Sequence, residues 1–185
     1  MKEPISFRGT IENCTAARFP VGILNLISNG ERYAECPTSA IDYSDEELLI
    51  KDLLLCLGND SQWGPLQVAR EFYYLRGRTD VLALTSSAEV VAFEGKLTRW
   101  REALQQAFRN TCFAHCSYVL LPPRVALTAC KHTLEFEKRR VGLCCIFRNK
   151  LEVLIDAPLL EPIQPWLTSL AISCFAEGGT GVKSA

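Results

Sequence analysis

Residues 78–97 read RTDVLALTSSAEVVAFEGKL, and the prediction of the fold starts from this segment. Two runs of apolar and β-branched residues lie on either side of a Ser-Ser turn, which is the pattern of two adjacent antiparallel strands. Asp80 stands near the start of the first run, and Glu94, Gly95 and Lys96 end the second. The sequence therefore predicts that two carboxylates and an ammonium group come together on neighbouring strands of one hairpin.

Further elements extend on both sides of this hairpin. Ser44 is expected as the N-cap of a helix, because Glu47 follows it by three residues and apolar residues then continue to a stop at Gly58. The same kinds of pattern predict the other elements. We expect strands at 67–75, 79–85, 89–94, 118–121, 141–147 and 151–155, helices at about 98–110 and 123–140, and an amphipathic segment at 166–175.

The order of these elements predicts an α/β fold with a central mixed β-sheet flanked by helices. Residues 44–156 are interpreted as the core domain. Residues 1–43 show no sustained periodicity and are interpreted as an extension that covers the core. Residues 157–185 are expected to form a C-terminal helix and a frayed tail that contains Gly-Gly-Thr-Gly.

The end of the second strand carries groups suited to a hard metal ion. Side chains alternate between the two faces of a strand, so Lys96 returns to the side of Glu94 while Gly95 presents only its backbone. Two carboxylates and a main-chain carbonyl are the oxygen ligands that Mg²⁺ or Mn²⁺ prefers. A lysine beside them can orient a water molecule or stabilise charge that develops on a phosphate.

This pattern resembles the motif of the PD-(D/E)XK phosphodiesterase superfamily, which has the restriction-endonuclease-like fold. The motif consists here of an Asp, thirteen intervening residues and then Glu-x-Lys on a strand after a helix. The blocks at 78–84, 90–97, 100–107 and 118–122 also resemble successive parts of that fold's core. The resemblance implies a nuclease in which Asp80 and Glu94 bind Mg²⁺ or Mn²⁺, with the Gly95 carbonyl as a third ligand. Lys96 would be the catalytic cation that serves the attacking water.

The family often adds an acid on the first helix. At 100° per residue, Glu46 falls on the apolar stripe that faces the sheet, so we favour it over Glu47 for this role. Glu71, on the strand before Asp80, is a further candidate acid. Gln106 resembles a glutamine that some members place beside the site, but Asn110 stands where an aromatic residue usually follows it.

The charge distribution bears on the partner. The chain of 185 residues has 20 Lys and Arg against 21 Asp and Glu, which excludes binding of nucleic acid through bulk charge. Residues 70–150 nevertheless hold 14 Lys and Arg against 7 Asp and Glu. Seven arginines of this segment are candidates for contacts with the phosphates of DNA, with RNA less favoured, although ordinary solvated faces explain them equally well. They are Arg70, Arg76, Arg78, Arg99, Arg101, Arg109 and Arg124.

Other features bear on location and on metals. No apolar run reaches the roughly 18 residues that span a bilayer and no signal peptide is evident, so we expect a cytoplasmic protein with no membrane contact. The nine cysteines are interpreted as buried apolar residues rather than disulfides. Cys112, His115 and Cys116 are close in sequence, but without a CxxC pair they are a weak zinc candidate.

Two alternatives to a free-standing enzyme stay open. The chain can be a relative of the nucleases that no longer cuts and serves as a nucleic-acid-binding or assembly module in a defence or repair system. It can also act as a homodimer or as a subunit of a larger complex, as many nuclease domains of this size do.

Overall fold

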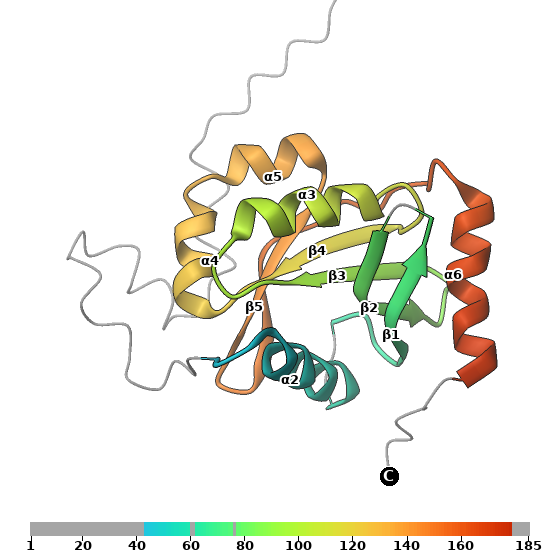
Figure 1. Ribbon diagram of the computed structural model, residues 1–185, viewed down its shortest axis with the longest axis horizontal. Coiled ribbons are helices and arrows are strands. Elements are labelled where there is room, and N and C mark those ends of the chain that lie inside the picture. The colour runs from blue at the N-terminus through green and yellow to red at the C-terminus, as the bar shows by residue number, and fades with distance from the viewer. Residues whose placement is uncertain (1–42, 60–61, 76, 179–185) are drawn as a thin grey trace, which may run out of the picture. The chain divides into compact units, whose positions relative to one another are not determined.

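The computed structural model describes residues 43–59, 62–75 and 77–178, and the predicted extension at 1–43 lies outside these apart from Tyr43. Six strands form one sheet whose spatial order follows the chain (Figure 1). They are β1 (Leu66–Tyr74), β2 (Gly77–Thr85), β3 (Val90–Gly95), β4 (Cys116–Leu120), β5 (Gly142–Phe147) and β6 (Lys150–Ile155).

The sheet is mixed. β1, β2 and β3 form an antiparallel meander, β4 and β5 run parallel to β3, and β6 returns antiparallel to β5. The parallel connections are made by helices, because a chain that returns in the same direction needs a long crossover. α3 (Trp100–Asn110) joins β3 to β4, while α4 (Pro123–Cys130) and α5 (Thr133–Arg139) join β4 to β5. The predicted α/β fold with a mixed sheet between helices is confirmed.

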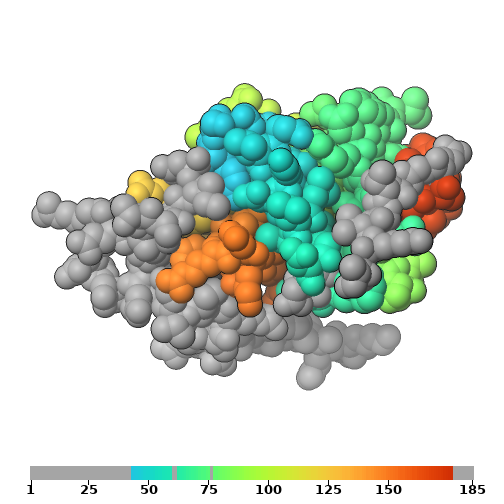
Figure 2. All heavy atoms as spheres, turned by 90° about the horizontal axis from the view of Figure 1, so that it is seen from below, coloured from blue at the N-terminus to red at the C-terminus, as the bar shows by residue number. Residues whose placement is uncertain are grey.

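The two faces of the sheet are covered by different helices. α2 (Glu46–Asn59) packs on one face, where its buried side chains meet alternate residues of β2 to β5. Figure 2 shows α2 in cyan beside the β5–β6 hairpin in orange, and the Cys56 thiol there donates to the Asn149 carbonyl at 3.5 Å. The other face carries α3, α4 and α5, and α6 (Pro165–Gly178) covers its β1–β3 end. Leucine and phenylalanine side chains buried in these layers contribute about 1.5–3 kcal/mol each.

Two local expectations are wrong. Asp45, not Ser44, caps α2: its Oδ1 accepts from the backbone N–H of Leu48 at 2.9 Å, and the Ser44 hydroxyl donates to the same carboxylate. The helix expected over 123–140 is split into α4 and α5. The Thr133 hydroxyl donates to the Cys130 carbonyl at the break, and a side chain that bonds to nearby backbone in this way competes with a continuing helix.

Gly142 is a position where the sheet tolerates no side chain. It pairs with Tyr118 of β4, and a Cβ at this position would overlap the Tyr118 ring and lie 2.8 Å from the Ala157 backbone nitrogen. That ring is itself held by Phe93, on which it stacks, and by the edge of Trp63. Relief of the overlap therefore requires movement of several packed groups.

We expect Gly142→Ala to lower the free energy of unfolding by about 2–3 kcal/mol, as overpacking in a rigid core does. Urea unfolding measures this. Gly64→Ala is the matched control, because a Cβ added at Gly64 would have nothing within 4 Å. Only the φ of 71° at this position is unfavourable for a residue with a side chain. That control should cost about 1 kcal/mol. Equal losses in the two variants would contradict the packing explanation.

The limits of the core remain a prediction at both ends. α6 lies beyond the predicted boundary at residue 156, and its Leu167, Ala171 and Phe175 are buried in the same layer as Phe72 of β1.

In the part of the chain that the structure describes, no helix has the length and apolar character that crossing a bilayer requires.

Candidate functional site

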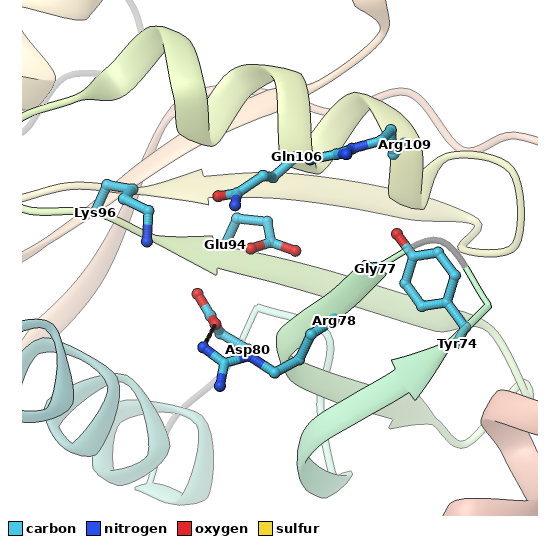
Figure 3. Close-up of a pocket in the computed structure, with 8 residues that line it drawn as sticks. All are labelled: Tyr74, Gly77, Arg78, Asp80, Glu94, Lys96, Gln106 and Arg109. Atoms are coloured by element: carbon cyan, nitrogen blue, oxygen red, sulfur yellow. Dashed lines mark ion pairs between the residues drawn. The ribbon is translucent and has the colours of Figure 1, made fainter.

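Asp80 and Glu94 come together because of the register between β2 and β3. Pairing of these antiparallel strands ends at Val81 and Phe93, and one further step along each strand places Asp80 opposite Glu94. Val81 and Phe93 pack towards α2, so the side chains next to them point to the other face. Figure 3 shows both carboxyl groups on the same side, pointing into one pocket.

Glu94 is a buried acid. Only 2% of the residue is exposed, and its Oε1 accepts a hydrogen bond of 2.7 Å from the Asn110 amide. Burial raises the pKa of the Glu94 carboxyl to about 8, and the neighbouring Asp80 carboxylate adds to the rise. Glu94 is therefore predominantly protonated at neutral pH when no cation is present.

Asn110 organises the site, although the sequence suggested no role for it. It is fully buried, and its Oδ1 accepts from the hydroxyls of Tyr74 and Thr79, both at 2.9 Å, while its amide donates to Glu94. Burial raises the pKa of Tyr74 to about 12, so this hydroxyl stays protonated as a donor. One side chain of α3 thus fixes Glu94 and holds the β1–β2 hairpin against the helix. The one sequence signal was an amide where the resembling family has an aromatic.

Asp80 is held by backbone and by a cation. Its Oδ2 accepts from the Gly95 N–H at 3.0 Å, and its Oδ1 lies 3.6 Å from the Arg78 guanidinium. The carbonyl of a strand residue points to the same edge as its N–H, so the Gly95 carbonyl also faces the Asp80 side. A Cβ on Gly95 would lie 2.8 Å from Ile50 Cδ1, so a side chain here would require that methyl group to move.

Lys96 lines the same pocket but is paired with an acid of α2. Its ammonium lies 2.7 Å from Glu46 Oε2, and its side chain is 12% exposed. Glu47 instead pairs with Arg70 at 2.6 Å, away from Lys96. Both acids line a hollow that Asp80 also lines, but Glu46 is the one that pairs with Lys96, and their roles remain predictions.

The two remaining candidates lie on opposite sides of the site. Glu71 has a left-handed φ of 55° within β1, is half exposed, and pairs with Arg78 at 3.2 Å. It shares with Glu46 and Asp80 a second hollow on the α2 side, so it borders the site without joining Glu94. Gln106 lines the Glu94 pocket from α3, and its Oε1 is a buried acceptor with no partner among the described residues.

The pocket between β2, β3 and α3 has a volume of about 130 Å³. Three cationic side chains and two carboxyl groups line it, and two of the cations, Arg78 and Lys96, also pair with Glu71 and Glu46 at its border. Four residues that were sequence candidates for the site line the pocket, namely Asp80, Glu94, Lys96 and Gln106. The other lining residues are Tyr74, Gly77, Arg78 and Arg109 (Figure 3). Arg78 and Arg109 had been noted only as general phosphate contacts.

The donor set fits a hard divalent cation in part. Asp80 and Glu94 offer carboxylate oxygens at one point, and Mg²⁺ commonly takes one or two carboxylates and completes its shell with water. Across the described ranges, no three His, Cys, Asp or Glu side chains are grouped to hold a metal. The weak zinc candidate is tied up otherwise: His115 Nδ1 accepts from the Val90 N–H, and the Cys116 thiol donates to the Pro158 carbonyl.

Comparison with known proteins supports the fold. No protein-family model and no curated protein matches the chain. A protein of unknown function from Silicibacter pomeroyi, SPO1766, is similar in structure over 74% of this chain and 86% of its own, with 17% identity and a TM-score of 0.53. A repair endonuclease from Pyrococcus abyssi shows partial similarity over 45% of this chain and 40% of its own, with 18% identity and a TM-score of 0.32. The α/β fold is thus shared with the first of these proteins.

Proposed function

We propose that this protein is a metal-dependent phosphodiesterase of the PD-(D/E)XK type that hydrolyses DNA, with RNA a less favoured substrate. One observation carries the proposal. The side chains of Asp80, Glu94 and Lys96 line one pocket. A buried acid beside a second acid is costly unless a cation joins them, so the pair is suited to binding one.

Asp80, Glu94 and the Gly95 carbonyl would hold Mg²⁺ or Mn²⁺. The bound ion would supply Lewis-acid chemistry, lowering the pKa of a water and neutralising phosphate charge. Lys96 would orient that water or stabilise the developing charge, and Glu46 would fix the position of the ammonium. Asn110 would hold the Glu94 carboxyl in a fixed orientation. Gln106 and Glu71 border this arrangement and are assigned supporting roles.

Metal binding should displace a proton from Glu94. The pKa of this carboxyl is about 8, so between pH 6 and 8 the acid must ionise before it binds a cation. We expect the apparent affinity for Mg²⁺ to rise about tenfold per pH unit below pH 8 and to level off above it. Calorimetry in two buffers of different ionisation enthalpy measures the proton released. An affinity that does not change with pH would contradict the involvement of Glu94.

The proposed activity is tested by incubating DNA with the purified protein in Mg²⁺, Mn²⁺ and EDTA. Cleavage is expected with either metal ion and none in EDTA. Asp80→Asn should abolish it, whereas Asp156→Asn, which changes an acid outside the pocket, should not. Cleavage by Asp80→Asn at the wild-type rate would reject the assignment.

The second candidate function is an inactive binding or assembly module. The favouring observation is that two cations of the site are already paired within the protein: Lys96 with Glu46, and Arg78 with both Glu71 and Asp80. These pairings give Lys96 and Arg78 partners within the protein when no metal is bound. DNA association that is the same in Mg²⁺ and in EDTA, together with no calorimetric signal for Mn²⁺, would favour the module over the enzyme.

The location is proposed to be cytoplasmic, as the sequence predicts. The protein is proposed to act as a homodimer or as a subunit of a larger complex. Analytical ultracentrifugation of the full chain distinguishes a dimer from a monomer.

A further inference from the structure

The arginines expected to contact phosphate differ in whether their charge is already engaged. Arg70, Arg78, Arg99 and Arg101 each pair with a carboxylate. Arg76 lies outside the described residues, and Arg124 lies on α4 and does not line the pocket. These pairings leave fewer cations to meet an incoming anion than the basic segment as a whole had indicated.

Arg109 differs from these four. Within the described ranges it has no carboxylate at ion-pair distance, and its side chain is exposed in the last turn of α3. It lines the pocket that holds Asp80 and Glu94, at the end where Tyr74 lies (Figure 3). Its positive charge opposes the rise in the pKa of Tyr74 that burial causes, which indicates that the guanidinium acts on this part of the pocket.

Gln106 provides a second, independent observation. It precedes Arg109 by three residues, so both side chains lie on one face of α3. Its Oε1 is buried without a hydrogen-bond partner among the described residues. A buried acceptor left unpaired is unfavourable, and a hydrated ligand in the pocket would supply the missing donor. On the α3 wall of the pocket, therefore, a guanidinium with no carboxylate partner and an amide oxygen with no donor lie three residues apart, counting partners among the described residues.

We propose that Arg109, together with Gln106, forms a phosphate subsite for the DNA strand, next to the phosphate at Asp80 and Glu94. The guanidinium would contact a neighbouring phosphodiester directly, and the Gln106 amide would bind it through ordered water. The subsite rests on the proposed function for its ligand, but it requires neither a metal nor cleavage. Its chemistry also suits free phosphate, and the experiment separates these two sources.

The test is fluorescence anisotropy with a labelled single-stranded DNA of roughly 15 nucleotides in EDTA, over a series of salt concentrations. Arg109→Gln is compared with Arg101→Gln. The two variants change the same helix and remove the same charge, but Arg101 pairs with Glu135 and lies over the Trp100 ring, outside the pocket. We expect Arg109→Gln to weaken binding about tenfold and to reduce the salt slope by about one, and Arg101→Gln to change affinity by less than about twofold.

If both variants weaken DNA binding equally, the proposed subsite is rejected, because the loss of one positive charge would then explain the effect wherever that charge lies. Wild-type protein that fails to bind the DNA would overturn it as well. If Arg109→Gln loses affinity for inorganic phosphate but retains its affinity for DNA, the DNA strand is not the ligand and the proposal fails. Wild-type protein that binds DNA through Arg109 but never cleaves it would reject the catalytic function and leave the subsite standing.

Discussion

Substituting methionine for Lys96 is expected to reduce Mg²⁺-dependent DNA cleavage by roughly a hundred- to a thousand-fold. Methionine keeps most of the length and apolar character of the lysine stem but removes the ammonium. A fixed donor or cation at a reacting phosphate contributes this much because it acts in a partly dehydrated pocket and needs no rearrangement during the reaction. Single-turnover cleavage at saturating DNA measures the effect on the chemical step.

Lys138→Met is the matched control, because Lys138 is an exposed lysine of the last turn of α5, away from the pocket. Its cleavage rate should equal that of the wild type within about twofold. The Lys96 variant should also remain folded, since the Glu46 partner that it leaves unpaired is 44% exposed and stays solvated. If Lys96→Met cuts DNA as fast as Lys138→Met, Lys96 has no role in the reaction.

Glu94→Gln is expected to stabilise the metal-free protein at high pH. The folded state raises the pKa of Glu94 from its ordinary value of 4.5 to about 8, so between these values the folded protein holds a proton that the unfolded chain has lost. Stability therefore falls as pH rises through this window and levels off above it. At 1.36 kcal/mol per pKa unit, the full penalty is on the order of 3–5 kcal/mol. The glutamine avoids this penalty and still accepts from Asn110.

The measurement is urea unfolding of both proteins in EDTA at pH 5, 7 and 9. The free-energy advantage of Glu94→Gln over the wild type should be small at pH 5 and increase towards pH 9. Addition of Mn²⁺ at pH 9 should stabilise the wild type and not the variant, because a ligand that binds only the folded state adds to its stability. A constant difference between the two proteins across this pH range would contradict the raised pKa of Glu94.

The hairpin at the centre of the fold was predictable from local pattern. Alternation of apolar residues predicts which side chains share a face. The register depends on the length of the turn, and a two-residue Ser-Ser turn would place Asp80 opposite Phe93. In the structure Ala88 also belongs to the turn, with a left-handed φ of 62°, so Thr85 bonds to Glu89 and Asp80 comes opposite Glu94. Helical periodicity predicted that Glu46 lies on the side of its helix that faces the sheet; the structure pairs Glu46 with Lys96, and its role is still a prediction.

The partners of Asn110 could not be predicted, because they come from three strands. Tyr74, Thr79 and Glu94 lie 36, 31 and 16 residues away along the chain, and no local pattern relates them. For the same reason, the sequence could not predict that Lys96 pairs with Glu46 or which arginines pair with a carboxylate. The division of 123–140 into two helices was not predicted either. At the break the Thr133 hydroxyl donates to the Cys130 carbonyl, a local bond of a kind that competes with helical hydrogen bonds.

The amide at position 110 also constrains how this protein can change. It accepts from two hydroxyls and donates to one acid, so residues 74, 79, 94 and 110 form a set whose substitutions are not independent. An apolar side chain introduced at any one of these positions leaves a buried polar group at another without its hydrogen-bond partner. A second replacement that removes this unpaired group compensates for the loss. Divergence at this point of the fold would therefore proceed through coordinated pairs of replacements.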